Sequence, residues 1–351
     1  MLPDVEGNEP RKERPNVLIT LAAVVIVIAG LRAGADVLLP ILSALFLSIL
    51  CIPPMKRLQR FGLPDWASVV VVSVGVSILF VAVTAIVGSS VDEFQNQLPL
   101  YKFRLNEITG DVLGWLQEQG MAISIEDIQN RIDTSQIMQL AGDTVQALLG
   151  VVSNGFLVLL TVVFMLLEAN GFRDKLRRAR GEPDSDLSDV TKATEQIQKY
   201  LAIKTFVSAV TSIGVAVLLW ALDVDFVLLW AMLAFLFNYV PNIGSLIAAV
   251  PAVLLALIQH GGGTAIAASI GFFAINMIVG NALEPRLMGR RLGLSTLVVF
   301  LSLIFWGWVW GNLGMLLSVP LTVIVKIALE QSEDFKGFAV LLGPPEELET
   351  F

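Results

Sequence analysis

The chain alternates long apolar runs with short charged segments. Six runs approach the length of about 20 residues that a helix needs to cross a bilayer; they occupy residues 17–31, 37–52, 67–88, 145–167, 205–222 and 264–282. Lipid offers the backbone no hydrogen-bond partner, so such runs form helices. Together with two longer apolar blocks, the pattern predicts an all-α polytopic membrane protein with about eight transmembrane segments.

The two longer blocks, 226–259 and 295–329, are each interrupted in the middle. Pro241 and Gly244 break the first block, and Gly311 and Gly314 break the second. Each arm would measure only about 22–25 Å at 1.5 Å per residue, whereas a bilayer core is about 30 Å thick. The pattern therefore predicts two interrupted helical hairpins, with two ordinary crossing helices per block as the alternative.

Charge predicts the orientation, because Lys and Arg collect in cytoplasmic loops. Basic clusters lie at 11–14, 56–60, 173–204 and 286–291, and Arg32 and Asp36 mark a short turn between the first two apolar runs. The first hairpin should then enter from outside and the second from inside, which makes the two hairpins inverted relative to each other. Both termini should be cytoplasmic, in a multi-pass protein of the cell (inner) membrane.

These features divide the chain into eight parts. They are a cytoplasmic segment 1–16, three transmembrane helices in 17–90, an extracytoplasmic insert 91–144, two helices in 145–222 with a basic amphipathic region 169–204, the outer hairpin 226–259, a helix 264–282, the inner hairpin 295–329 and a cytoplasmic tail 330–351. The insert is acidic and has apolar residues at helical spacing, so we expect it to be helical. It is either a solvated spacer or a surface that binds a partner.

Composition narrows the class of function. Hydrophobic residues make up 55% of the chain and charged residues 15%, against about 45–50% and about 25% in soluble domains. Cys51 is the single cysteine and there is no phosphate-binding loop, Cys/His cluster or Ser/His/Asp set. We therefore expect no enzyme activity, metal, cofactor or nucleic-acid partner. The expected partners are the lipid bilayer and a small polar solute or monovalent cation.

Candidate binding residues lie at the interruptions, where backbone groups are freed. The substrate-binding candidates are Asn238, Asn242, Ser245, Asn276, Gly311 and Asn312, and the hinge candidates are Pro241, Gly244, Gly314 and Pro320. The polar side chains around Pro241 either bind a ligand or ion, or satisfy the break itself.

Glu284 is the candidate for ion coupling. It is the acidic residue at the edge of the apolar run 264–282, and carboxylates at such positions are functional candidates. The alternative is a salt bridge to a nearby arginine at the interface, Arg286, Arg290 or Arg291.

Several motifs resemble the autoinducer-2 exporter family. They are Pro241/Gly244, Glu284/Pro285, Trp306/Gly307, Trp310/Gly311, Gly314/Met315 and Val319/Pro320, together with the segments LLPILSALFLSILCIPPMKRLQRFGLP and KYLAIKTFVS. The resemblance covers residues 15 to 330. It implies a multi-span permease, a homo-oligomer, that exports small polar molecules or exchanges cations. Asn242 and Ser245 depart from the family pattern, which has an aromatic residue and a proline there.

The leading hypothesis is a secondary transporter that exports a small polar molecule by alternating access around two hairpin tips. A sodium (cation)/proton antiporter of the same family is one alternative. A non-transporting membrane scaffold that binds a partner through the acidic insert is the other.

Overall fold

The computed structural model describes residues 17–119, 142, 155–179, 188–241, 244–288, 293–330 and 335–343. The regular elements in these ranges are all helices: α1 (Val17–Ala33), α2 (Ala35–Arg60), α3 (Asp65–Glu118), α6 (Gly155–Ala179), α7 (Ser188–Ala221), α8 (Val227–Phe237), α9 (Gly244–His260), α10 (Gly262–Ile278), η1 (Val279–Leu283), α11 (Glu284–Met288), α12 (Thr296–Glu330) and α13 (Lys336–Leu342). Within the described part, five helices are long and apolar enough to span a membrane. The expected all-α polytopic membrane fold is confirmed.

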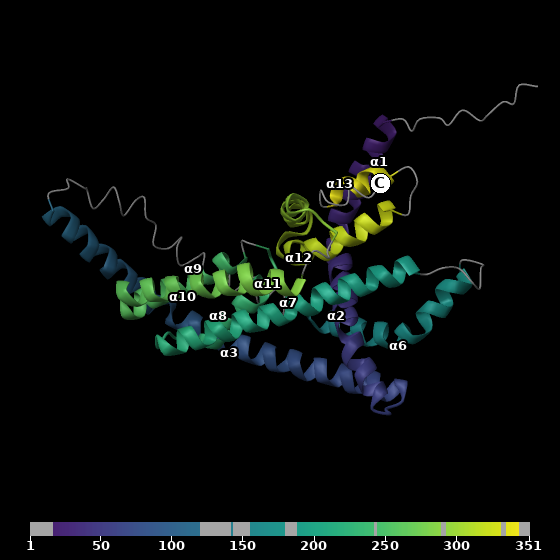
Figure 1. Ribbon diagram of the computed structural model, residues 1–351. Helices are drawn as coiled ribbons and strands as arrows, with labels where there is room; N and C mark the ends of the chain where they lie inside the picture. Colours follow the sequence, from purple (N-terminus) through teal and green to yellow (C-terminus); the bar gives the residue numbers. More distant parts are fainter. Residues whose placement is uncertain are drawn as a thin grey trace, which may run out of the picture.

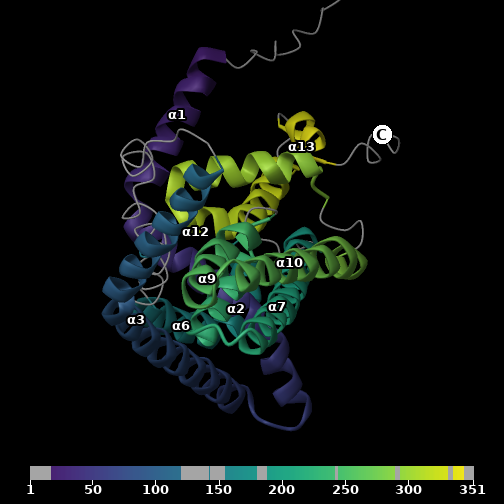
Figure 2. The same cartoon turned by 90° about the vertical axis from the view of Figure 1, so that its left-hand side faces the viewer.

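Side chains from distant parts of the chain form three apolar clusters. One joins α3, α7, α8, α9 and α10; a second joins α12 to α2 and the start of α7; a third joins α2, α3 and α6. α7 contributes to the first two clusters and runs through the middle of the bundle (Figures 1 and 2). It is therefore the element against which both interrupted blocks pack.

The short turn expected between Arg32 and Asp36 falls at Gly34: α1 ends at Ala33 and α2 starts at Ala35. Gly34 between them keeps near-helical angles of φ −88° and ψ 10°. Its N–H bonds the Gly30 carbonyl, and its own carbonyl accepts from Leu38. Gly34 thus separates the two helices, and its hydrogen bonds link the end of one to the start of the other.

Two helices extend beyond the ends of the apolar runs from which they were predicted. α2 continues through Pro53 and Pro54 to Arg60. α3 runs unbroken from the third apolar run into the acidic insert, as a helix of 54 residues, or about 81 Å at 1.5 Å per residue. The polarity changes near residue 91, but no strong helix stop accompanies it. The rest of the insert up to 144 lies mostly outside the described residues.

The first hairpin, α8 and α9, is closed where its two ends meet. The Asp225 N–H donates to Gln259 Oε1 at 3.1 Å, and Gln259 Nε2 also bonds the Asp225 carboxylate. A ring nitrogen of His260 lies 2.8 Å from the Asp223 carbonyl oxygen. With 11 residues, α8 is about 16 Å long and too short to cross a bilayer core of about 30 Å. α8 and α9 therefore fold back on one another as a helical hairpin, and its re-entry into the membrane stays a prediction.

The second hairpin lies within α12, whose helical course breaks at Gly311 with φ 63° and ψ −145°. The arms fold together: Trp306 Nε1 donates to Thr322 Oγ1 at 3.0 Å. At the open end, Lys326 Nζ donates to the Gly293 carbonyl at 2.6 Å. This block is therefore also a hairpin. The side of the membrane from which each hairpin enters stays a prediction.

Candidate functional site

α7 presents a row of polar side chains to the elements packed around it. Lys204 and Ser208 are separated by four residues and so lie on one face of the helix, and both are buried. Thr205 and Ser212 flank this face and are half-buried. A polar row inside an apolar bundle needs partners, because an unpaired polar group in an apolar environment costs about 1–3 kcal/mol.

The tip of the first hairpin supplies two of these partners. Asn238 Nδ2 donates to Ser208 Oγ at 3.0 Å, and the Tyr239 hydroxyl lies 2.6 Å from Thr205 Oγ1. Asn238 is only 8% exposed. α8 ends just before these residues because Pro241 follows, which lacks an N–H and cannot continue a helix. The break at the end of α8 therefore places two polar side chains, Asn238 and Tyr239, against α7.

Gly244 makes the tip tight. A Cβ at this position would lie 1.7 Å from the carbonyl oxygen of Phe237, so only glycine lets α9 start so close to the end of α8. Pro241 and Gly244 thus have the geometric role expected of a turn. Ser245 is half-buried in the first turn of α9, and Asn242 lies outside the described residues.

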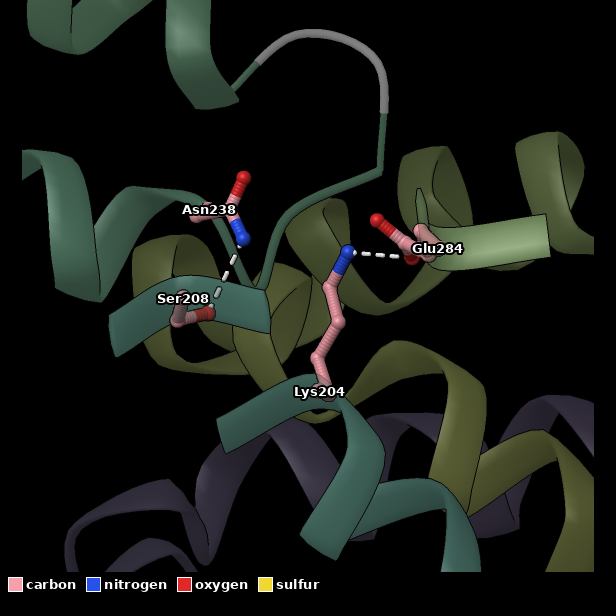
Figure 3. A network of polar contacts seen from close by, with 4 residues as sticks. All are labelled: Lys204, Ser208, Asn238 and Glu284. Atoms are coloured by element: carbon pink, nitrogen blue, oxygen red, sulfur yellow. Dashed lines mark hydrogen bonds and ion pairs between the residues drawn. The ribbon is translucent and has the colours of Figure 1, made fainter. Parts of the chain in front are cut away.

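Glu284 is held by Lys204. Lys204 Nζ donates to Glu284 Oε1 at 2.6 Å, and the side chains are 4% and 21% exposed. Figure 3 shows this ion pair beside the Asn238–Ser208 bond, both pairs being anchored on neighbouring turns of α7. The partner that the structure shows for Glu284 is thus a lysine 80 residues away along the chain; of the arginines expected as partners, Arg290 and Arg291 lie outside the described residues.

A π-helical turn, Val279–Leu283, directly precedes Glu284. Such turns are rare and occur often at functional sites. The turn joins α10 to α11, so that the helix continues while its register shifts ahead of the carboxylate. Asn276, on α10, is exposed rather than buried.

The tip of the second hairpin lies against α1. Trp310 Nε1 donates to the Leu31 carbonyl at 2.8 Å, and the Arg32 guanidinium lies 5.1 Å from the centre of the Trp308 ring. Gly311 and Asn312 are exposed. Within the described residues, no hydrogen bond or ion pair joins this tip to the tip of the first hairpin. The expected meeting of both tips is therefore not seen in this arrangement.

The remaining hinge candidates serve the packing of the second hairpin. A Cβ on Gly314 would lie 2.0 Å from the Trp306 carbonyl oxygen, so glycine is needed where the arms touch. Trp306 and Trp310 stack with centroids 5.0 Å apart. Pro320 is buried inside α12. The tryptophans at positions 306 and 310 thus pack the hairpin.

Four residues of the site were missed by sequence reasoning: Lys204, Thr205, Ser208 and Tyr239. One signal was available for Lys204, which is a cation embedded in the run KYLAIKTFVSAV. A charged residue inside a membrane helix faces the bundle interior and has a partner. Where the structure describes the chain, no group of three or more His, Cys, Asp or Glu side chains could hold a metal ion.

An interrupted helical hairpin that is bound to a long helix through buried polar pairs is typical of one class of protein, the polytopic membrane transporters. The chain belongs to the AI-2E family transporters, whose family model matches residues 21–334.

Relatives match over nearly their whole length. TqsA of Escherichia coli K12, named as an AI-2 transport protein, is 39% identical over 327 residues, covering 93% of this chain and 95% of TqsA. A Haemophilus influenzae protein whose name proposes a role in transport is 41% identical over 336 residues, covering 94% and 97%. YhhT of E. coli K12, with a similar name, is 36% identical over 340 residues, covering 97% of each chain.

Proposed function

We propose that this chain is a secondary transporter that exports a small polar solute by alternating access. The observation that carries the proposal is the pair of buried polar contacts on α7, Asn238–Ser208 and Lys204–Glu284, inside an apolar bundle. Polar groups inside membrane proteins are costly and mark solute or ion pathways. The relative TqsA, named for AI-2, suggests a small polar solute of that kind.

In this proposal α7 is the fixed element and the first hairpin moves against it. The hairpin tip is bound to α7 through the side chains of Asn238 and Tyr239. A polar solute can replace these bonds one for one, so that release of the tip costs little once solute is present. The protein would work in the cell (inner) membrane as a homo-oligomer with cytoplasmic termini.

Solute efflux from proteoliposomes tests the proposal, with AI-2 as the first solute. Asn238→Ala should lower the initial rate of efflux tenfold or more, because it removes the amide that the tip offers to α7. Thr161→Ala is the matched control, since that hydroxyl bonds only its own helix at the Leu157 carbonyl. Asn238→Ala and Glu284→Ala proteins that both transport at the wild-type rate, for every solute tried, would refute the proposal.

A second candidate function is sodium (cation)/proton antiport. The observation that favours it is Glu284, a carboxylate largely removed from solvent and paired with a buried ammonium group. Antiport needs a carboxylate that exchanges a proton for a cation. Proton flux driven by a sodium gradient in proteoliposomes should disappear in Glu284→Gln; unchanged flux in that variant would exclude antiport through this residue.

A further inference from the structure

The ion pair between Lys204 and Glu284 is the most buried ion pair in the described chain. The Lys204 side chain is 4% exposed and that of Glu284 is 21% exposed, whereas in Lys175–Glu168 the values are 69% and 54%. The lysine is thus enclosed, and the carboxylate keeps a side that solvent can reach. The pair sits beside the tip of the first hairpin (Figure 3).

A positive partner stabilises a carboxylate that is largely removed from solvent, as Glu284 is. Removing one member of a buried pair leaves an uncompensated charge, which is far more costly than loss of the attraction itself. If Lys204 moves away from Glu284, another cation can take its place beside the carboxylate.

We infer that Lys204 is a tethered competitor for a monovalent cation at Glu284. The ammonium group occupies the place that a solvent cation such as Na⁺ takes when the pair separates. The inference rests on the proposed transport function, because it gives that function its coupling ion. It assigns Lys204 a role of its own: the lysine sets the affinity for the cation by competing with it.

The surroundings of the pair fit such an exchange. Hard monovalent cations prefer oxygen ligands, as do other hard cations, and the Glu284 carboxylate offers such oxygens while it keeps a solvent-exposed side. The π-helical turn Val279–Leu283 ends immediately before the carboxylate. A change from π to α hydrogen bonding in this turn would shift the register at Glu284 and separate it from Lys204.

Competition makes a prediction that a merely structural ion pair does not. Loss of the lysine should strengthen cation binding, because the carboxylate then loses the ammonium group that is its ion-pair partner in the described residues. Loss of the carboxylate should abolish cation binding. A structural pair would instead lose folding in both variants and gain binding in neither.

The experiment measures saturable binding of ²²Na⁺ to the purified full-length protein at pH 7.5, with choline chloride keeping the ionic strength constant. Lys204→Gln should bind Na⁺ at least tenfold more tightly than wild type. Glu284→Gln and the double variant Lys204→Gln/Glu284→Gln should show no saturable binding. Lys175→Gln, which opens the exposed pair with Glu168, is the matched control and should bind as wild type does.

Folding of each variant is checked by gel filtration. Lys204→Gln can misfold because its Glu284 carboxylate is left unpaired, whereas the double variant has no unpaired charge and shows whether the fold survives without the ion pair. Should that single variant fail to fold, Lys204→Arg replaces it: its fork-shaped cation holds a carboxylate more firmly, so Na⁺ should bind at least threefold more weakly. Unchanged or weaker Na⁺ binding in Lys204→Gln, unchanged or tighter binding in Lys204→Arg, or wild-type binding in Glu284→Gln would overturn the inference.

Solute efflux separates this inference from the proposed function. If the wild-type protein exports solute but Lys204→Gln shows no gain in Na⁺ binding, the proposed transport function stands and the competitor role of Lys204 is refuted. If the variants bind Na⁺ as described but the wild-type protein exports no solute, the competitor role stands and the proposed transport function is refuted.

Discussion

Replacing Gly311 by alanine isolates the backbone strain at the turn of the second hairpin. Gly311 has φ 63° and ψ −145°, a combination that is essentially restricted to glycine and costs other residues about 1–3 kcal/mol. A Cβ added here meets no heavy atom within 4 Å. The whole loss in Gly311→Ala should therefore come from the backbone and not from crowding.

The expected loss of about 1–3 kcal/mol is measured by unfolding of the purified protein in detergent. The first one or two kcal/mol alone shift the folded-to-unfolded ratio roughly 5- to 30-fold. Gly75→Ala is the control, because its Cβ also meets nothing within 4 Å and it lies within the helix α3, where alanine is favoured by about 0.5–1 kcal/mol. Equal stability of Gly311→Ala and wild type, in an assay that detects the gain in Gly75→Ala, would refute the assigned strain.

Three further substitutions probe the first hairpin. Gly244→Ala should destabilise the protein by about 1–3 kcal/mol through the clash with the Phe237 carbonyl, and wild-type thermal unfolding would contradict this. Tyr101→Phe removes a hydroxyl that lies 2.5 Å from Gln97 Oε1, accepts from Gln259 Nε2 at 3.3 Å and lies 3.4 Å from Asp225 Oδ2, and should cost about 0.5–1.5 kcal/mol; hydrogen exchange should speed up at the hairpin ends, and an unchanged exchange rate would count against these contacts. Trp230→Ala empties a fully buried site and should cost about 3–5 kcal/mol in denaturant unfolding; a loss below about 1 kcal/mol would mean that the site collapses.

Local breaks were readable from the sequence because their causes are local. A proline followed closely by a glycine, or two glycines close together, breaks each of the two long apolar blocks, whereas proline alone does not end a helix here, since α2 continues through Pro53 and Pro54. Both hairpins were predicted for this reason, and the contacts Asp225–Gln259 and Trp306–Thr322 confirm them. The short turn expected between Arg32 and Asp36 is likewise found, at Gly34 between α1 and α2.

The candidate site was only half visible for the opposite reason. Asn238 and Glu284 stand out in the sequence as polar residues beside a break or an apolar run. Their partners Ser208 and Lys204 do not, because a serine or a lysine in an apolar helix can also lie against lipid or reach toward the interface. The face of α7 that becomes buried depends on what packs against it.

The sequence by itself determined that this chain is a helical membrane protein with two interrupted hairpins. Run length, the bilayer's lack of hydrogen-bond partners and the chemistry of proline and glycine act within a few residues. Only the tertiary structure decided that Lys204 meets Glu284 across 80 positions and that the second tip rests on α1. Those pairings follow from how whole helices fill space around α7, and no local pattern encodes that.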